Sequence, residues 1–239
     1  MPRQPRTPPA DATPMEPMTT HAENAAIFAA QPRDVTFDRR AASVLPLALD
    51  EKPSAVLDIG CSRGELLGRI PAEIRRCGID CLDPAAVSPD FEYRQYDIAH
   101  GVPFKDGEFD VVFAGEVVEH LLDTLGFLGE CRRILRPRGV LLLTTPNLAY
   151  WRNLLQWARQ QQFFFVDHRA GENGHVRYFA PRTLRAALGE AGFHVEALFS
   201  VGDLPTSTSR VLRAVGEISM RCCPMRNLSL IAKARRVEA

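Results

Sequence analysis

The segment AGEVVEHLL, residues 114–122, carries two carboxylates and an imidazole directly after FDVVFA, an apolar run that predicts a buried strand. Glu116, Glu119 and His120 are three and four residues apart, a spacing that predicts one face of a helical turn. His120 could act as a general base, with Glu116 or Glu119 orienting its ring. The same set could bind a divalent metal ion, or the acids could simply favour the start of a helix. The residues alone leave all three interpretations open.

The composition predicts one globular domain without a general charge bias. The chain has 239 residues, of which 46% are hydrophobic, and its 29 basic residues balance 29 acidic ones. We therefore expect no nucleic-acid partner, although a balanced total charge does not exclude local charged patches. The six cysteines lack paired zinc-type spacing, and neither a signal peptide nor a long apolar span is evident. We expect a cytoplasmic protein with reduced thiols and no membrane insertion.

The chain divides into three predicted parts. Residues 1–20 are rich in proline and poor in residues that could pack, which predicts a disordered lead. Residues 21–53 contain two apolar stretches, 25–30 and 41–49, that predict helices able to lie over a site as a lid. Residues 54–239 form the main predicted domain.

Short apolar runs alternate with helical patterns along this main domain. Strands separated by helices predict an α/β fold with a mostly parallel sheet of seven strands and helices on both faces. An insertion at 202–227 carries a further apolar helix, 211–220. The predicted strands are 55–59, 76–80, 91–97, 109–114, 139–145, 193–200 and 228–234, and the other predicted helices are 64–70, 121–135, 148–160 and 181–192.

The turn after the first predicted strand has the composition of a ligand-binding loop. Glycines allow a sharp turn and close approach of a ligand to the backbone, and a following helix would offer free N–H groups. Asp80 lies twenty residues beyond Gly60, at the end of the second predicted strand, where an acid can accept both hydroxyls of a ribose. The loop residues concerned are Asp58, Gly60, Cys61, Ser62 and Gly64.

Asp97 ends the third predicted strand. Because the glycine-rich loop, Asp80 and Asp97 follow one another in this order, residues 54–234 resemble the class I S-adenosylmethionine-dependent methyltransferases. The resemblance implies that the loop holds the methionine part of S-adenosylmethionine, that Asp80 holds its ribose, and that Asp97 with Ile98 meets its adenine. Ser62 departs from the family, which commonly has a third glycine there. Singly, these acids could instead cap turns or helices, and a nicotinamide-binding Rossmann domain is the main competitor, although it usually needs a closer GxGxxG.

The same resemblance bears on the metal interpretation of residues 116–120. The E-x-x-E-H segment is similar to one in ubiquinone-pathway O-methyltransferases, where it is associated with a divalent metal, and small-RNA 2′-O-methyltransferases add a histidine downstream. His175 is the corresponding candidate here, so a metal ion would have Glu116, Glu119, His120 and His175 as ligands. Relatives without a known metal share the segment, which leaves His120 with Glu116 as the favoured catalytic pair.

The region 146–193 provides the expected acceptor site. It combines aromatic residues with arginines, which could stack on a ring and hold an anion, and it is similar to bacterial methyltransferases of surface-glycan or lipid-linked sugar precursors and to a methionine-pathway relative. We therefore expect methyl transfer to oxygen of a small hydroxylated acceptor, and the acceptor that we favour is a sugar or glycan precursor. The alternatives are nitrogen or carbon methylation and a non-catalytic, cofactor-binding regulatory subunit. The alternative for 148–160 is an amphipathic helix that buries Trp151, Leu154, Leu155 and Ala158 against the sheet, and for Trp151, Leu154 and Leu155 we favour this packing role.

Overall fold

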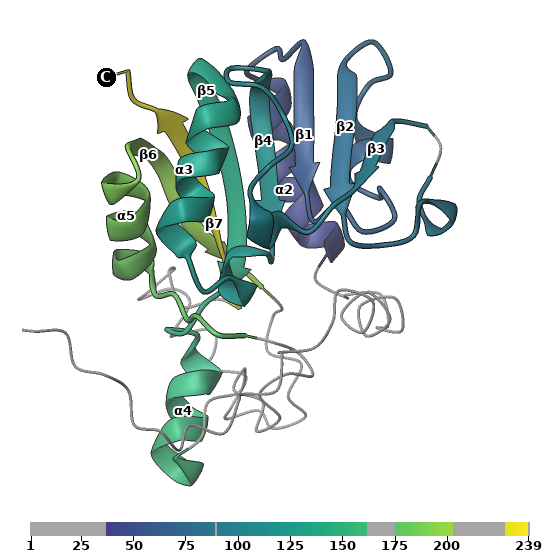
Figure 1. The fold of residues 1–239 in the computed structure, drawn as a ribbon. Coiled ribbons are helices and arrows are strands. Elements are labelled where there is room, and N and C mark those ends of the chain that lie inside the picture. Colours follow the sequence, from purple (N-terminus) through teal and green to yellow (C-terminus); the bar gives the residue numbers. More distant parts are fainter. Residues whose placement is uncertain (1–36, 89, 162–174, 203–227, 239) are drawn as a thin grey trace, which may run out of the picture.

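The computed structural model describes residues 37–88, 90–161, 175–202 and 228–238 (Figure 1). A single sheet has the strand order β3-β2-β1-β4-β5-β7-β6. Within the described residues, β7 alone runs antiparallel to its neighbours, so the mostly parallel sheet of seven strands is confirmed. The strands are β1 (Ala55–Ile59), β2 (Arg75–Asp80), β3 (Glu92–Gln95), β4 (Phe109–Gly115), β5 (Leu135–Pro146), β6 (Phe193–Val201) and β7 (Ser229–Arg236).

Helices cover both faces of the sheet, as predicted (Figure 1). On one face α3 (Thr124–Ile134) and α5 (Pro181–Glu190) bury Leu128, Leu184 and Leu188 in the larger core. On the other face α2 (Phe37–Leu49) packs Ala41, Val44 and Ala48 against β1, β4 and β5. Burial of both faces explains why β1 and β4 have almost continuous apolar sequences instead of alternating ones.

The predicted helix at 64–70 is wrong. The segment forms turns and a single 3-10 turn, η1 (Leu67–Arg69). Gly64 has a φ of +86°, outside the helical region, and Pro71 follows directly, so too few residues remain to nucleate an α-helix. Further 3-10 turns are η2 (Pro84–Ala86), η3 (Ile98–His100) and η4 (Val118–His120).

The helix α4 (Trp151–Gln160) does not pack along the sheet as the amphipathic interpretation required. Trp151 is buried, but Leu154 and Trp157 are 40% and 52% exposed, and Ala158 is exposed as well. Asn153 anchors the first turn, because its amide donates to the carbonyl oxygens of Asn147 and Leu148 at 3.3 and 3.4 Å. Beyond that anchor, α4 extends away from the sheet (Figure 1).

Several predicted segments lie outside the described residues. They are the lead 1–20, residues 21–36 with the predicted helix 25–30, and the helix 211–220 of the insertion. The second helix of residues 21–53, predicted at 41–49, is confirmed within α2. In the part of the chain that the structure describes, no helix has the length and apolar character needed to cross a bilayer.

Candidate functional site

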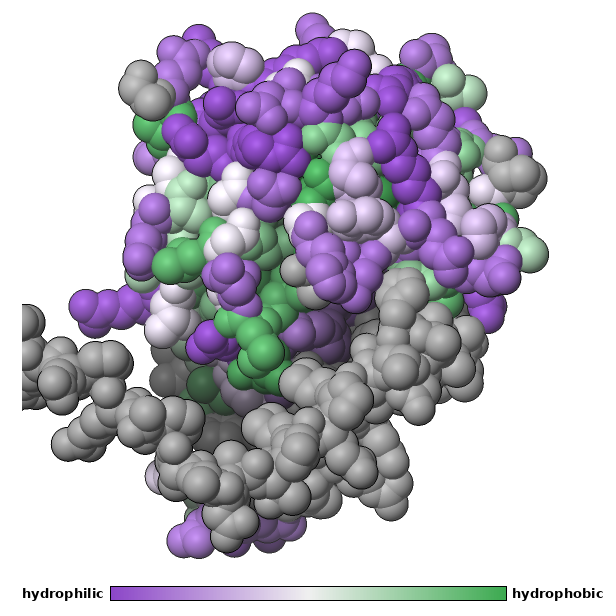
Figure 2. Space-filling view, viewed as in Figure 1, coloured by the Kyte–Doolittle hydropathy of each residue, from purple (hydrophilic) through white to green (hydrophobic). Residues whose placement is uncertain are grey.

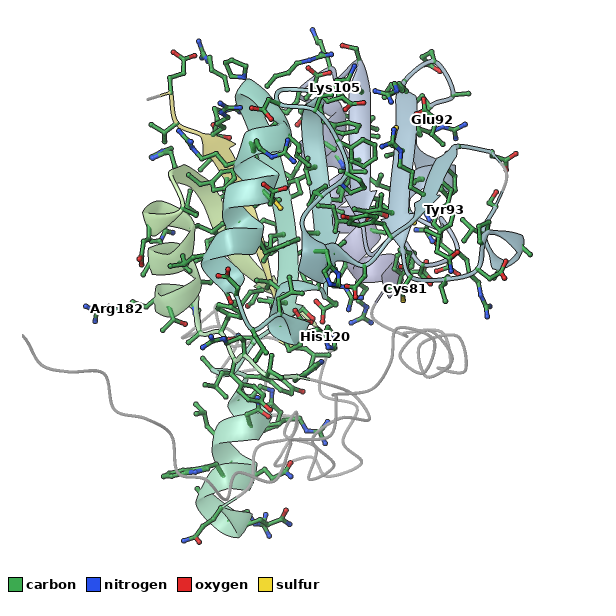
Figure 3. The ribbon with its side chains drawn as sticks, viewed as in Figure 1. Cys81, Glu92, Tyr93, Lys105, His120 and Arg182 are labelled. Carbon is green, nitrogen blue, oxygen red and sulfur yellow. The ribbon has the colours of Figure 1, made fainter. Side chains whose placement is uncertain are left out.

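The predicted site residues come from different strands but meet at one edge of the sheet. In a parallel sheet the loops after all the strands emerge at the same edge, and here β1, β2 and β4 each end in one of the sequence motifs. Figure 3 shows His120, after β4, and Cys81, after β2, at this lower edge. We call it the carboxyl edge, and the opposite one the amino edge.

The loop after β1 adopts the conformation that its small residues allow. Gly60, Ser62 and Gly64 have positive φ values of 73°, 49° and 86°, so the non-glycine Ser62 occupies a left-handed conformation as well. A Cβ atom on Gly60 would lie 2.6 Å from Cγ2 of Val117, which shows how closely the loop approaches the segment after β4. Gly60 N donates to Ile79 O at 2.8 Å, which fastens the loop to the end of β2.

Asp80 holds this loop in place. Its carboxylate accepts hydrogen bonds from Ser62 N at 2.8 Å and from Leu82 N at 3.2 Å. The first bond joins the two segments that the sequence predicted to bind one cofactor. It also gives Asp80 a structural role that sequence spacing did not predict.

Asp58 and Cys61 are buried beneath the loop. Burial, and then the nearby negative charge of Asp80, raises the pKa of Asp58 to about 8. Burial also raises the pKa of the Cys61 thiol, whose side chain packs in the core on the α2 side of the sheet. A cationic group bound beside Asp58 would favour its carboxylate form.

Asp97 and Ile98 lie after β3, farther along the same edge. The side chain of Asp97 is 38% exposed, and its Oδ2 lies 3.6 Å from Nδ1 of His100. Ile98 is half-buried against the larger core. Their assignment to the adenine stays a prediction, since no contact in the structure tests it.

Glu116 does not share a helical turn with Glu119 and His120, so that part of the sequence prediction is wrong. Its φ of 55° is left-handed, and the 3-10 turn η4 begins only at Val118. Its Oε1 accepts a hydrogen bond from Thr144 Oγ1 at 2.9 Å and lies 3.8 Å from Nε of Arg40, a largely buried residue of α2.

Glu119 is the most buried acid of the edge, with an exposed fraction of 1%. Its Oε2 accepts a hydrogen bond from Thr145 Oγ1 at 3.0 Å, whereas Oε1 has no hydrogen-bond partner among the described residues. Burial, followed by the charge of Glu116, raises the pKa of Glu119 well above its usual range. An unsatisfied buried carboxylate oxygen is costly unless a ligand completes it.

His175 reaches the site because its neighbours bind the backbone of η4. Val176 N and Arg177 N donate to Glu119 O at 2.8 and 3.0 Å. The rings of His120 and His175 lie edge to face with centroids 4.8 Å apart. Burial lowers the pKa of His175, which favours the neutral imidazole.

Glu119, His120 and His175 form one cluster, in which each offers a ligand atom within 4.8 Å of the others. This set fits a divalent cation, because it contains two imidazoles, one of which burial keeps neutral, and a carboxylate with an unsatisfied oxygen. Glu116, the fourth predicted ligand, is not part of the cluster. Within the described residues, three of the four candidates are thus brought together.

Sequence reasoning missed the partners of the two acids. Thr144 and Thr145, near the end of β5 at the same edge, donate hydrogen bonds to Glu116 and Glu119. Two hydroxyl side chains at the end of an apolar run could have predicted polar partners at this edge. Arg40 gave no such signal, because only the packing of α2 against the sheet brings it to Glu116.

Comparison with known proteins finds methyltransferases. The family described as methyltransferase domain matches residues 33–198 of the chain. A probable S-adenosylmethionine-dependent methyltransferase of Mycolicibacterium smegmatis is 39% identical over 156 residues, covering 61% of this chain and 54% of the relative. The human mitochondrial ubiquinone biosynthesis O-methyltransferase is 30% identical over 158 residues, covering 60% of this chain and 42% of the relative. The chain thus spans about half the length of these curated relatives.

A solved structure supports the fold. The crystal structure of a SAM-dependent methyltransferase from Archaeoglobus fulgidus superposes with a TM-score of 0.60 at 20% identity, covering 85% of this chain and 96% of that one. At this identity the likeness speaks for the fold alone.

Proposed function

Because the chain belongs to the class I S-adenosylmethionine-dependent methyltransferases, we propose that it transfers the methyl group of S-adenosylmethionine to a hydroxyl oxygen of a small acceptor. The observation that carries the proposal is the cluster of Glu119, His120 and His175, which lies at the same edge as the loop closed by Asp80. Cofactor and acceptor would then meet between the loop and the cluster. The human ubiquinone relative, named as an O-methyltransferase, supports oxygen as the receiving atom.

In the proposed reaction, the acceptor oxygen attacks the methyl carbon in line with the carbon–sulfur bond. The new carbon–oxygen bond forms as the carbon–sulfur bond breaks, and the electron pair stays on sulfur in S-adenosylhomocysteine. His120 takes the proton of the acceptor hydroxyl. The positive charge of the imidazolium then favours the carboxylate form of Glu119 beside it, against the burial that raises the pKa of this acid. Positioning of the two reactants provides much of the rate in such a displacement.

On the cofactor side, Asp58 is proposed to face the positively charged methionine portion. Its buried carboxyl gains a counter-charge when the cofactor binds, which offsets the cost of burial that raises its pKa to about 8 in the free protein. Asp80 is proposed to accept the ribose hydroxyls while it keeps the loop closed through Ser62 N.

A divalent cation, if bound, would be held by Glu119, His120 and His175. It would supply Lewis acidity that lowers the pKa of the acceptor hydroxyl. The base and metal roles make different demands on His175. A metal site needs both histidines, so His175→Ala would remove metal binding and turnover together, whereas a His120 base would retain most of its activity in that variant.

The acceptor class that we favour is a sugar or glycan precursor, on the sequence resemblance of residues 146–193. A phenolic hydroxyl of the quinol type is the second candidate, since the human relative belongs to ubiquinone biosynthesis. Small metabolites, lipid-linked glycans and quinol-containing lipid extracts would be incubated with labelled S-adenosylmethionine, with and without EDTA. The His120→Ala variant is the negative control for the labelling.

Label confined to the glycan fraction supports the favoured acceptor, and label in the quinol fraction replaces it with the second. Label recovered on nitrogen or carbon would overturn transfer to oxygen. If no fraction accepts label although the protein binds S-adenosylmethionine, the proposed activity fails and a regulatory, cofactor-binding role takes its place.

A further inference from the structure

The arginines at the two edges of the sheet have different partners. Figure 2 shows mostly hydrophilic residues over the upper part of the face that it draws, where the amino edge lies. There, Arg75 pairs with Glu92 and Glu108, and Arg136 pairs with Asp110. Carboxylates of the fold therefore compensate the charges of these two arginines in place.

Arg177, before α5 at the carboxyl edge, is held by backbone oxygens. Its guanidinium Nη2 donates to Leu122 O at 2.6 Å, and its backbone N donates to Glu119 O at 3.0 Å. These two acceptors lie on either side of His120 in the chain, so Arg177 lies along the segment that carries the candidate base. In the part of the chain that the structure describes, no carboxylate pairs with this guanidinium. A carbonyl oxygen fixes the position of a guanidinium but does not neutralise its charge.

The sequence around Arg177 has an excess of positive charge. The described residues 144–161 and 175–189 contain no Asp or Glu, although the whole chain balances 29 basic and 29 acidic residues. The intervening sequence, 162–174, adds one arginine and two acids, so arginines outnumber acids over the whole region. The arginines of the two described stretches are Arg152, Arg159, Arg177, Arg182 and Arg185.

The acids that lie near Arg177 in the fold have other partners. Glu116 lies beside Arg40, and Asp123 caps the first turn of α3. Glu119 is buried and accepts a hydrogen bond from Thr145. A fixed positive charge without a counter-ion among the described residues thus lies next to the candidate base.

We propose that Arg177 binds an oxyanion, a phosphate or carboxylate group, of the acceptor whose hydroxyl receives the methyl group. The bond to Leu122 O uses one N–H of the guanidinium, and its other N–H groups can bind two oxygens of one oxyanion. His120 would then meet the hydroxyl of the same molecule. The acceptor is therefore an anionic hydroxyl compound and not a neutral one. This inference rests on the proposed function, since it concerns the acceptor of that reaction.

A purely structural role for Arg177 makes a different demand. Its bonds to the chain around His120 would then serve only to hold His175 against the imidazole of His120. Loss of the side chain would in that case lower kcat, because His175 would move, and would leave acceptor binding unchanged. Loss of an oxyanion contact raises KM instead, since the acceptor loses a charged hydrogen bond.

The charge of the acceptor is the first test. Cell extract freed of protein and nucleic acid would be separated on an anion exchanger before incubation with the full chain and labelled S-adenosylmethionine. We expect label in the retained, anionic fraction. Label confined to the unretained fraction would overturn the proposal and would leave methyl transfer standing.

Arg177→Met is the second test, since methionine keeps an unbranched side chain but has no N–H donor. With the labelled fraction as acceptor, KM should rise about 10- to 100-fold while kcat changes less than about threefold. Arg177→Lys should recover part of the loss, because lysine keeps the charge without the planar fork. Arg182→Met is the matched control and should change neither constant, since Arg182 points away from the sheet (Figure 3). A fall in kcat at unchanged KM would leave Arg177 only the role of holding His175 and would overturn the proposal.

Anion binding without turnover is the third test. Inorganic phosphate and acetate would be titrated into the full chain and followed by NMR of the anion. We expect at least one of them to bind about tenfold more weakly to Arg177→Met than to the wild type, with Arg182→Met equal to the wild type. Equal affinity in all three proteins, or no binding of either anion by the wild type, would overturn the proposal. Binding that depends on Arg177, together with no methyl transfer to any fraction, would refute the proposed function and leave the anion site standing.

Discussion

The pKa values of acidic side chains shift in opposite directions at the two edges of the sheet. At the amino edge, Glu51 and Glu196 share Arg235, whose hydrogen bonds lower the pKa of both acids. At the carboxyl edge, burial raises the pKa of Asp58 and of Glu119. Figure 3 shows the separation, with Glu92 and Lys105 at the upper edge and His120 at the lower one.

This difference separates stability from function within one fold. A carboxylate held by arginine and backbone N–H groups stabilises the folded state. A buried acid whose pKa is raised costs folding free energy, and proteins keep such groups where a ligand or a reaction uses them. Substitutions at the carboxyl edge should therefore affect activity, and those at the amino edge stability.

His120→Ala should give the largest effect. Loss of the base, or of a metal ligand, should lower kcat about 100- to 10,000-fold while the dissociation constant of S-adenosylmethionine changes less than about threefold. Turnover assays and calorimetric titration measure the two. His194→Ala, an exposed histidine at the amino edge, is the control and should keep wild-type kcat. Equal losses of turnover and cofactor affinity in His120→Ala would remove the catalytic assignment.

Asp80→Ala should give the second-largest effect, a loss of affinity for the cofactor. It removes the proposed ribose contacts and the hydrogen bond from Ser62 N, so the affinity for S-adenosylmethionine should fall about 10- to 100-fold. Asp83→Ala, which removes the side-chain bond to Ala85 N in the next turn, should change affinity less than about twofold. Unchanged affinity in Asp80→Ala would refute the ribose assignment.

Asp110→Ala, at the amino edge, should leave kcat unchanged but lower the free energy of unfolding by about 1–2 kcal/mol. Although burial alone would raise the pKa of Asp110, bonds from Ala55 N, Ser54 N and Arg136 lower it. Its contribution is therefore fully present above the unfolded pKa of about 3.9 and is lost as pH falls through the lower folded value.

Urea unfolding between neutral and acidic pH measures this effect, and the gap between wild type and variant should narrow in acid. Asp106→Ala is the matched control, because Asp106 is 82% exposed in its pair with Arg133 and should contribute less than about 0.5 kcal/mol. A gap that stays constant down to low pH would show that Asp110 acts through packing and not through its charge.

The sequence predicted the strands better than the segments between them. Ala55–Ile59 was predicted at its observed bounds, because a run that is apolar except for Asp58 and lies between turn residues has few alternatives to a buried strand. The helix at 64–70 failed because the left-handed conformation of Gly64 depends on the ligand loop and not on helix propensity. The packing of α4 was also mispredicted, since its apolar spacing does not say which surface it covers.

The sequence by itself determined the family, the sheet and the order of motifs that meet at its carboxyl edge, because hydrophobic periodicity and the glycine-rich turn are local properties of the chain. Only the tertiary structure decided which of those side chains meet. It separated Glu116 from Glu119 through one left-handed residue, and it brought His175 to His120 by backbone bonds to Glu119 across more than fifty residues. Contacts between distant segments depend on how the elements pack in space, and spacing along the chain does not encode that packing.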